Sequence, residues 1–177
     1  MESSTDLFLS TVEWLRENYS SFRFFAERDV VWTVQKRVLE LVEQKGIPYK
    51  VFNDYPILPG KGRRSRSVDL AIINQDQIIE VAVEFKYEPS RKRQDICSHK
   101  LPVVFWTGEY GVGKDVERIR EFISAGKAEM AYSVFIDEGG RYRKRTPYPQ
   151  SRWIDWGSNE TEVCEVSVLW SQEQARR

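Results

Sequence analysis

The sequence predicts an α/β fold in which a central mixed β-sheet is flanked by helices. Two segments, residues 24–45 and 113–125, carry apolar side chains at helical spacing, which is typical of helices with one buried face. Between and after them lie short runs rich in valine, isoleucine and aromatic residues, which are typical of strands. The chain has 177 residues, 41% of them hydrophobic, so we expect one domain, 1–177, with a complete core.

The first core helix is expected over residues 24–45, and Gly46 directly after it is a candidate C-cap. Its buried face is formed by four aliphatic residues: Val31, Val34, Val38 and Leu41. Because Glu27 lies about one helical turn before Val31, its side chain is expected on the side that meets the sheet. Another amphipathic segment, about residues 5–19, predicts an extra N-terminal helix that packs on the core or on a partner.

Two apolar runs, residues 67–73 and 78–86, are joined by the polar segment 74–77 and predict an antiparallel hairpin. A turn centred on this segment places Asp69 opposite Glu84, with their Cβ atoms roughly 5 Å apart. Two like charges opposed on an apolar sheet are destabilising unless positive charge lies between them. A divalent metal and a lysine would supply that charge, so the hairpin predicts metal-assisted hydrolysis.

Side chains alternate along a strand, so Glu84 and Lys86 are expected on one face of the sheet and Phe85 on the other. The remaining strands are expected at residues 47–58, before the hairpin, and at residues 130–137, after the second helix. The core therefore runs helix, three strands, helix, strand.

This core spans about residues 24–137. Residues 163–170 predict one further strand in a tryptophan-rich C-terminal extension, about residues 146–177. The sequence thus predicts an added helix before the core and an added strand after it.

Asp69, followed on the next strand by Glu84 and Lys86, resembles the motif of the PD-(D/E)XK nuclease superfamily, which has the restriction-endonuclease-like fold. The order of elements is that of the superfamily core. Val68 departs from the pattern, because it stands where the proline of the motif would be. The Glu27-Arg28 pair is similar to a pair near the start of the same helix in small resolvase-like members. Alternatively, Glu27 only interacts favourably with the helix dipole.

The resemblance implies a metal-dependent nuclease that hydrolyses phosphodiester bonds of nucleic acid, with DNA favoured. Asp69 and Glu84, with the backbone carbonyl of Phe85, are then expected to bind Mg²⁺, for which Mn²⁺ can substitute. Lys86 would orient the attacking water and stabilise the developing negative charge. Glu27 would bind a second metal ion or relay a proton.

Local basic clusters are the expected contacts to nucleic acid, because the net charge of the chain is zero and supplies no global attraction. The first basic cluster precedes the hairpin acid and consists of Lys61, Arg63, Arg64 and Arg66. The second basic cluster follows the hairpin lysine and consists of Arg91, Lys92 and Arg93. Both could line a groove for phosphates; the alternative is ordinary solvated surface charge.

Two alternative functions are open. Residues 108–115 nearly match the phosphate-binding loop GxxxxGK[ST], but Asp115 stands where a hydroxyl should hold magnesium, so a nucleotide-binding protein is the less favoured of the two. The other alternative is a non-catalytic module on the same fold that binds nucleic acid or another protein, since a fold does not determine a function.

The composition disfavours several other classes. A single histidine, His99, and two distant cysteines argue against a zinc site and a Ser-His-Asp triad. The cysteines also suggest a reducing compartment, and no apolar run is long enough to span a membrane, so we expect a cytoplasmic protein. Because cutting a duplex usually needs two active sites, a homodimer through the N-terminal helix or the C-terminal extension is compatible with the expected activity.

Overall fold

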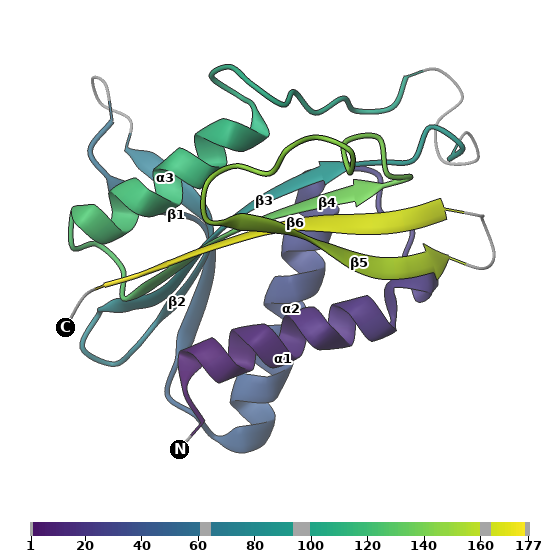
Figure 1. Ribbon diagram of the computed structural model, residues 1–177. Coiled ribbons are helices and arrows are strands. Elements are labelled where there is room, and N and C mark those ends of the chain that lie inside the picture. The colour runs from purple at the N-terminus through teal and green to yellow at the C-terminus, as the bar shows by residue number, and fades with distance from the viewer. Residues whose placement is uncertain (1, 61–64, 94–99, 160–163, 176–177) are drawn as a thin grey trace.

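The computed structural model describes residues 2–60, 65–93, 100–159 and 164–175. Three α-helices, one short 3₁₀ turn (Tyr19–Ser21) and six strands are present in this part of the chain (Figure 1). The helices are α1 (Ser4–Glu17), α2 (Glu27–Lys45) and α3 (Val112–Ser124). The strands are β1 (Lys50–Leu58), β2 (Arg66–Ile73), β3 (Ile79–Glu88), β4 (Met130–Glu138), β5 (Ser151–Asn159) and β6 (Cys164–Gln174).

The six strands form one mixed sheet in the order β1-β2-β3-β4-β6-β5. Only β3 and β4 run parallel among the neighbouring pairs of this sheet, and the other four pairs are antiparallel. A parallel pair requires a crossover connection, and α3 lies within the connection between β3 and β4. The predicted α/β class with a mixed sheet between helices is therefore confirmed.

The sheet has helices on both faces. In Figure 1, α1 and α2 lie below the sheet and α3 lies above it. Leu70 and Val83 belong to the apolar cluster that α1 and α2 complete. Their neighbours Ala71 and Ala82 belong to a second cluster, completed by Phe122 of α3. This alternation follows from the two-residue period of a strand, and it directs the side chains of Glu84 and Lys86 towards the α3 face.

Helix α2 buries the predicted aliphatic face, with Val30 as an additional member. It begins at Glu27, later than the predicted start at residue 24, because the Asp29 carboxylate accepts hydrogen bonds from the backbone N–H groups of Phe25 and Ala26. Such an acceptor in the first turn satisfies N–H groups at the helix end. Gly46 ends the helix in the left-handed conformation, at φ 61°, as its sequence position predicts.

The hairpin of β2 and β3 has the predicted register over three pairs and shifts by one residue beside the turn, where Ile73 pairs with Ile79. Leu70 pairs with Val83, and the next two pairs follow the same register towards the turn. In the turn, the side-chain oxygen of Asn74 accepts backbone hydrogen bonds from Asp76 and Ile78. Continued by one residue beyond Leu70 and Val83, this register brings Asp69 opposite Glu84.

Segments near both ends of the chain are packed into the core, which therefore extends beyond the predicted residues 24–137. Helix α1 packs on the core rather than only on a partner, since Phe8 is buried and its ring centroid lies 4.8 Å from that of Tyr132. Strand β6 pairs with β4 from Gln174 to Val166, so the strand expected near residues 163–170 is longer than predicted and lies inside the sheet.

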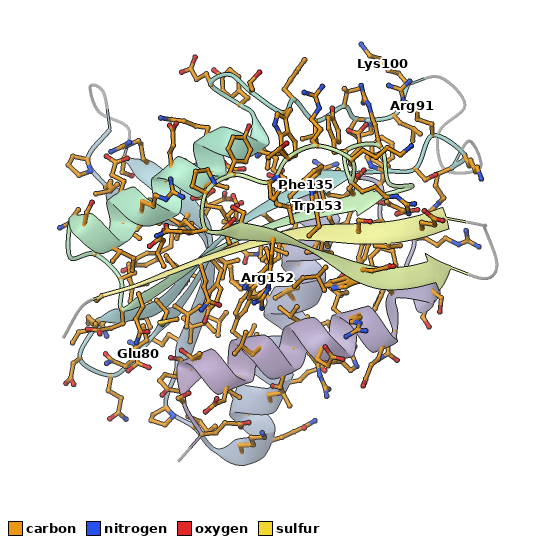
Figure 2. All side chains as sticks on the ribbon, viewed as in Figure 1. Glu80, Arg91, Lys100, Phe135, Arg152 and Trp153 are labelled. Carbon is orange, nitrogen blue, oxygen red and sulfur yellow. The ribbon has the colours of Figure 1, made fainter. Side chains whose placement is uncertain are left out.

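Strand β5 was not predicted. Trp153 on β5 has its ring centroid 6.1 Å from that of Phe135 on β4 (Figure 2), and its ring forms part of an apolar cluster on the α3 face.

No helix within the described residues is long and apolar enough to cross a membrane.

Candidate active site

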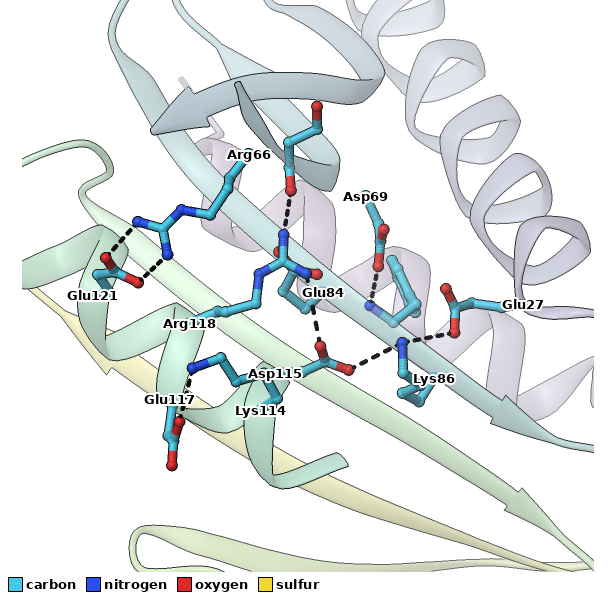
Figure 3. Close-up of polar contacts among 12 residues, drawn as sticks. Glu27, Arg66, Asp69, Glu84, Lys86, Lys114, Asp115, Glu117, Arg118 and Glu121 are labelled. Carbon is cyan, nitrogen blue, oxygen red and sulfur yellow. Dashed lines mark hydrogen bonds and ion pairs between the residues drawn. The ribbon is translucent and has the colours of Figure 1, made fainter. Parts of the chain in front are cut away.

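The predicted site residues come together beside α3. Asp69 belongs to β2, Glu84 and Lys86 belong to β3, and Glu27 is the first residue of α2 (Figure 3). The sequence places these residues on three separate elements, and the antiparallel pairing of β2 with β3 brings two of the elements into contact.

Asp69 lies where the pairing of β2 with β3 ends. Its Oδ2 atom accepts a hydrogen bond of 2.7 Å from the backbone N–H of Phe85. The carboxylate therefore takes the place of a strand carbonyl as the acceptor for this N–H, which would otherwise lose a partner at the strand end. Burial raises the pKa of Asp69, although the Phe85 N–H and nearby cations act against this rise.

Lys86 lies between two carboxylates, one carried by α2 and the other by α3. Its Nζ atom is 3.1 Å from Glu27 Oε2 and 3.3 Å from Asp115 Oδ2 (Figure 3). Burial alone would lower the pKa of Lys86, but Asp115 and Glu27 outweigh this effect and raise it above the usual value. Lys86 is therefore a charged lysine held in place by two ion pairs.

The side chain of Glu27 points towards this site and pairs with Lys86. An interaction with the helix dipole alone would not require this orientation. Burial raises the pKa of Glu27 to about 7, with the charge of Asp69 acting in the same direction and Lys86 acting against it. A carboxyl group with this pKa exchanges a proton near neutral pH. Glu27 thus has the position and the acidity for proton transfer.

Glu84 is almost completely buried, at 1% exposure. Burial and the charge of Asp69 raise the pKa of Glu84 well above its usual range, while Arg118 acts against this rise. Arg118 Nη2 lies 3.0 Å from Glu84 Oε1. The contact is an ion pair in which Oε1 still lacks a hydrogen bond of good geometry.

Asp115 and Arg118 of α3 lie beside these residues, although neither was among the predicted site residues. Asp115 is buried, and burial raises its pKa to about 6, against the effect of Lys86. A signal for Asp115 was present in the sequence: it shares one helical stripe with Ile119 and Phe122, which are buried. An acid on an apolar stripe requires a polar partner, but the partner, Lys86, lies far away in the chain.

The loop that resembles a phosphate-binding loop is not arranged as one. The backbone N–H groups of Val112, Gly113 and Lys114 already have acceptors: they donate to the backbone carbonyls of Phe105, Trp106 and Gly111, at 2.9, 3.2 and 3.0 Å. A phosphate-binding loop needs such N–H groups free for its ligand. The geometry of α3 therefore argues against the nucleotide-binding alternative.

The structure describes four members of the two basic clusters: Arg66, Arg91, Lys92 and Arg93. Lys61, Arg63 and Arg64 lie outside the described residues. The fourth member of the first basic cluster, Arg66, forms a bidentate pair with Glu121 of α3, at 2.8 and 2.5 Å.

In the second basic cluster, Arg91 and Lys92 line a surface cavity at the carboxyl end of β3 (Figure 2 marks Arg91). Arg93 is instead buried, with its Nη1 atom 2.6 Å from Glu138. A guanidinium enclosed in the core has no access to a phosphate. Arg93 is therefore corrected from a nucleic-acid contact to a structural residue.

A metal ion fits the chemistry of this site but would need a local rearrangement. Asp69 and Glu84 supply carboxylate oxygens, which magnesium and manganese prefer. Two buried carboxylate oxygens, Glu84 Oε1 and Asp115 Oδ2, each face a cation in an ion pair but lack a hydrogen bond of good geometry. Among the residues that the structure describes, however, no group of three or more histidine, cysteine or acidic side chains is arranged to hold a metal ion. Lys86 and Arg118 supply the positive charge among the acids in this conformation.

Comparison with known proteins identifies no family for this chain. No protein-family model matches it, and no curated protein matches it either.

Proposed function

We propose that the protein is a metal-dependent nuclease that hydrolyses phosphodiester bonds of nucleic acid, with DNA favoured as substrate. The observation that carries this proposal is the convergence of Glu27, Asp69, Glu84 and Lys86, from three elements, in one partly buried site. The element order α2, β1, β2, β3, α3, β4 also fits the order of the PD-(D/E)XK superfamily core, to which we propose that the chain belongs.

Asp69 and Glu84, with the backbone carbonyl of Phe85, are the groups that would hold Mg²⁺, or Mn²⁺ in its place. All three supply oxygen ligands, and burial, with the charge of Asp69 as a smaller contribution, raises the pKa of Glu84. A bound divalent ion would lower the pKa of a coordinated water and neutralise charge on the phosphate.

Lys86 and Glu27 have separate roles in the proposed reaction. Lys86 remains charged at neutral pH, so it can hold the attacking water by its lone pair and stabilise negative charge that develops on the phosphate. Glu27, whose pKa is about 7, can accept a proton from that water directly or through a second water molecule. Lys86 and Glu27 form an ion pair with each other, which holds the carboxylate next to the ammonium group.

Manganese calorimetry tests the proposed metal site. We expect the wild-type protein to bind Mn²⁺ and the variant Asp69→Asn to lose this binding, because the amide removes a charged oxygen donor. Asp76→Asn is the matched control, since Asp76 lies in the exposed turn at the other end of the same hairpin, and it should bind Mn²⁺ like the wild type. Failure of the wild type to bind would reject the metal-dependent mechanism.

A second candidate is a non-catalytic module that binds nucleic acid or a protein partner. One observation favours it: Lys86 and Arg118 already neutralise the carboxylates without a metal. The two functions are separated by Asp69→Ala. A nuclease should lose metal-dependent cleavage of DNA while it retains DNA binding, whereas a binding module has no cleavage to lose.

A further inference from the structure

Arg118 is the residue through which α3 reaches the proposed metal site. Its Nη2 atom lies 3.0 Å from Glu84 Oε1, and its Nη1 atom lies 3.8 Å from Asp115 Oδ1 (Figure 3). The same guanidinium also donates a short hydrogen bond to the backbone carbonyl of Ser67 on β2. Arg118 thus bridges α3 to both strands of the hairpin.

The guanidinium supplies charge at the place where a metal is expected. Glu84 is enclosed at 1% exposure, and an ionised carboxylate there requires a cation beside it. The side chain of Arg118 is 24% exposed, so it lies at the boundary between the buried acid and the solvent. An arginine cannot relieve repulsion by losing its proton, so a second cation beside Glu84 would repel the Arg118 guanidinium.

The two cations of the site are held differently. Lys86 forms its ion pairs with Glu27 and Asp115, which are not the acids of the proposed metal pair. Arg118 forms its closest ion pair with Glu84, which is one of them. A divalent ion shared by Asp69 and Glu84 would therefore compete with Arg118 directly and leave the contacts of Lys86 in place.

We infer that Arg118 is a displaceable cation: it neutralises Glu84 in the metal-free protein and turns outward to a phosphate of the nucleic acid when a metal ion takes its place. This inference rests on the proposed nuclease function. The planar guanidinium suits the second role, because it can donate two parallel hydrogen bonds to one phosphate. The partial exposure of the side chain provides the route from Glu84 to the substrate side.

Opposite changes in two affinities test the inference. Arg118→Ala removes the competitor for Glu84, so calorimetry at about pH 8, where the acids are more fully ionised, should give Mn²⁺ binding about three- to tenfold tighter than wild type. The same variant loses a phosphate contact. Its affinity for a mixed-sequence DNA oligonucleotide in the presence of Mn²⁺ should therefore fall about tenfold.

Arg120→Ala is the control, because Arg120 lies on the same helix and pairs with Glu173 outside the site, at 3.1 Å. It should leave both affinities unchanged. Arg118→Lys keeps a cation near Glu84 but lacks the planar fork, so its Mn²⁺ affinity should stay near that of wild type while its DNA affinity falls. This second variant keeps the test decisive if the alanine variant does not fold.

A purely structural arginine would give a different result. Unchanged or weaker Mn²⁺ binding in folded Arg118→Ala, with wild-type binding intact, would overturn the role of Arg118 and leave the proposed metal site standing. If the wild type itself binds no Mn²⁺, the proposed function fails and the role of Arg118 fails with it.

Discussion

At the scale of single residues, Lys86 is the side chain on which the proposed activity depends most. We expect Lys86→Ala to abolish metal-dependent cleavage of DNA and to leave the fold intact. The fold should survive because the acids left behind, Glu27 and Asp115, have pKa values of about 7 and 6 and can take up a proton instead of remaining as unpaired charges. Cleavage assays and thermal unfolding of the variant check both statements.

Lys114→Ala is the matched control for this substitution. Lys114 also forms an ion pair with a glutamate, Glu117, at 3.1 Å, but on the exposed surface of α3, where such a pair contributes little to stability. The control should cleave like the wild type. Full activity in Lys86→Ala would contradict the proposed catalytic role.

The acidity of Glu27 predicts how stability depends on pH in the metal-free protein. A glutamate titrates near 4.5 in the unfolded chain, whereas folded Glu27 titrates at about 7. Between these values the folded state binds more protons than the unfolded state, so the free energy of unfolding falls as the pH rises. We expect this fall between about pH 5 and about pH 7, and a smaller slope in Glu27→Gln.

Urea unfolding at several pH values, with a chelator present, measures this slope. Glu13→Gln, on the exposed side of α1, serves as the control and should keep the wild-type slope. Asp115 acts in the same direction as Glu27, so the slope of Glu27→Gln should be reduced but not zero. An unchanged slope in Glu27→Gln would show that Glu27 does not titrate as the burial of its side chain implies.

At the scale of elements, the sequence predicted helices and strands best where the periodic signal is long. Helix α2 and the β2–β3 hairpin were found with the correct buried faces and register, because both depend on neighbours in the sequence. The boundaries were less accurate, since side-chain caps such as Asp29 decide them. Pro56 did not prevent β1 from forming because this strand lies at the edge of the sheet.

Helix α1 is predicted to be an integral part of the core rather than a surface for a partner. Phe8 is completely buried and contacts the rings of Tyr132 and Trp170. Phe8→Ala should lower the free energy of unfolding by about 3–5 kcal/mol, measured by urea denaturation. The adjacent Leu9 is 41% exposed, so Leu9→Ala should change the free energy of unfolding by less than about 1 kcal/mol. Equal effects of both substitutions would contradict this packing.

At the scale of the whole molecule, the C-terminal strands complete the sheet rather than extend it. Strand β6 pairs with β4 and buries Val168 and Leu169, one on each face. A chain that ends at Gln150 would lose this strand together with β5 and expose the edge of β4. We expect such a truncated protein to lack a cooperative thermal transition. A cooperative transition near the wild-type melting temperature would contradict this expectation.

The sequence by itself determined the fold class, the order of the core elements and the placement of Asp69, Glu84 and Lys86 on two neighbouring strands of one hairpin. These follow from short-range regularities: the helical and strand periods, and the pairing of two strands joined by a short turn. Each depends on side chains a few residues apart or on a pair of strands joined directly.

Only the tertiary structure decided that Asp115 and Arg118 enter the site, that Arg93 is buried against Glu138, and that β6 lies beside β4. These contacts join segments that are far apart in the chain. They depend on which surfaces meet when α3 crosses over the sheet and when the C-terminal strand returns to it. No local sequence pattern predicts these contacts, because the burial of the side chains and the charges around them arise only after the helices have packed on the sheet.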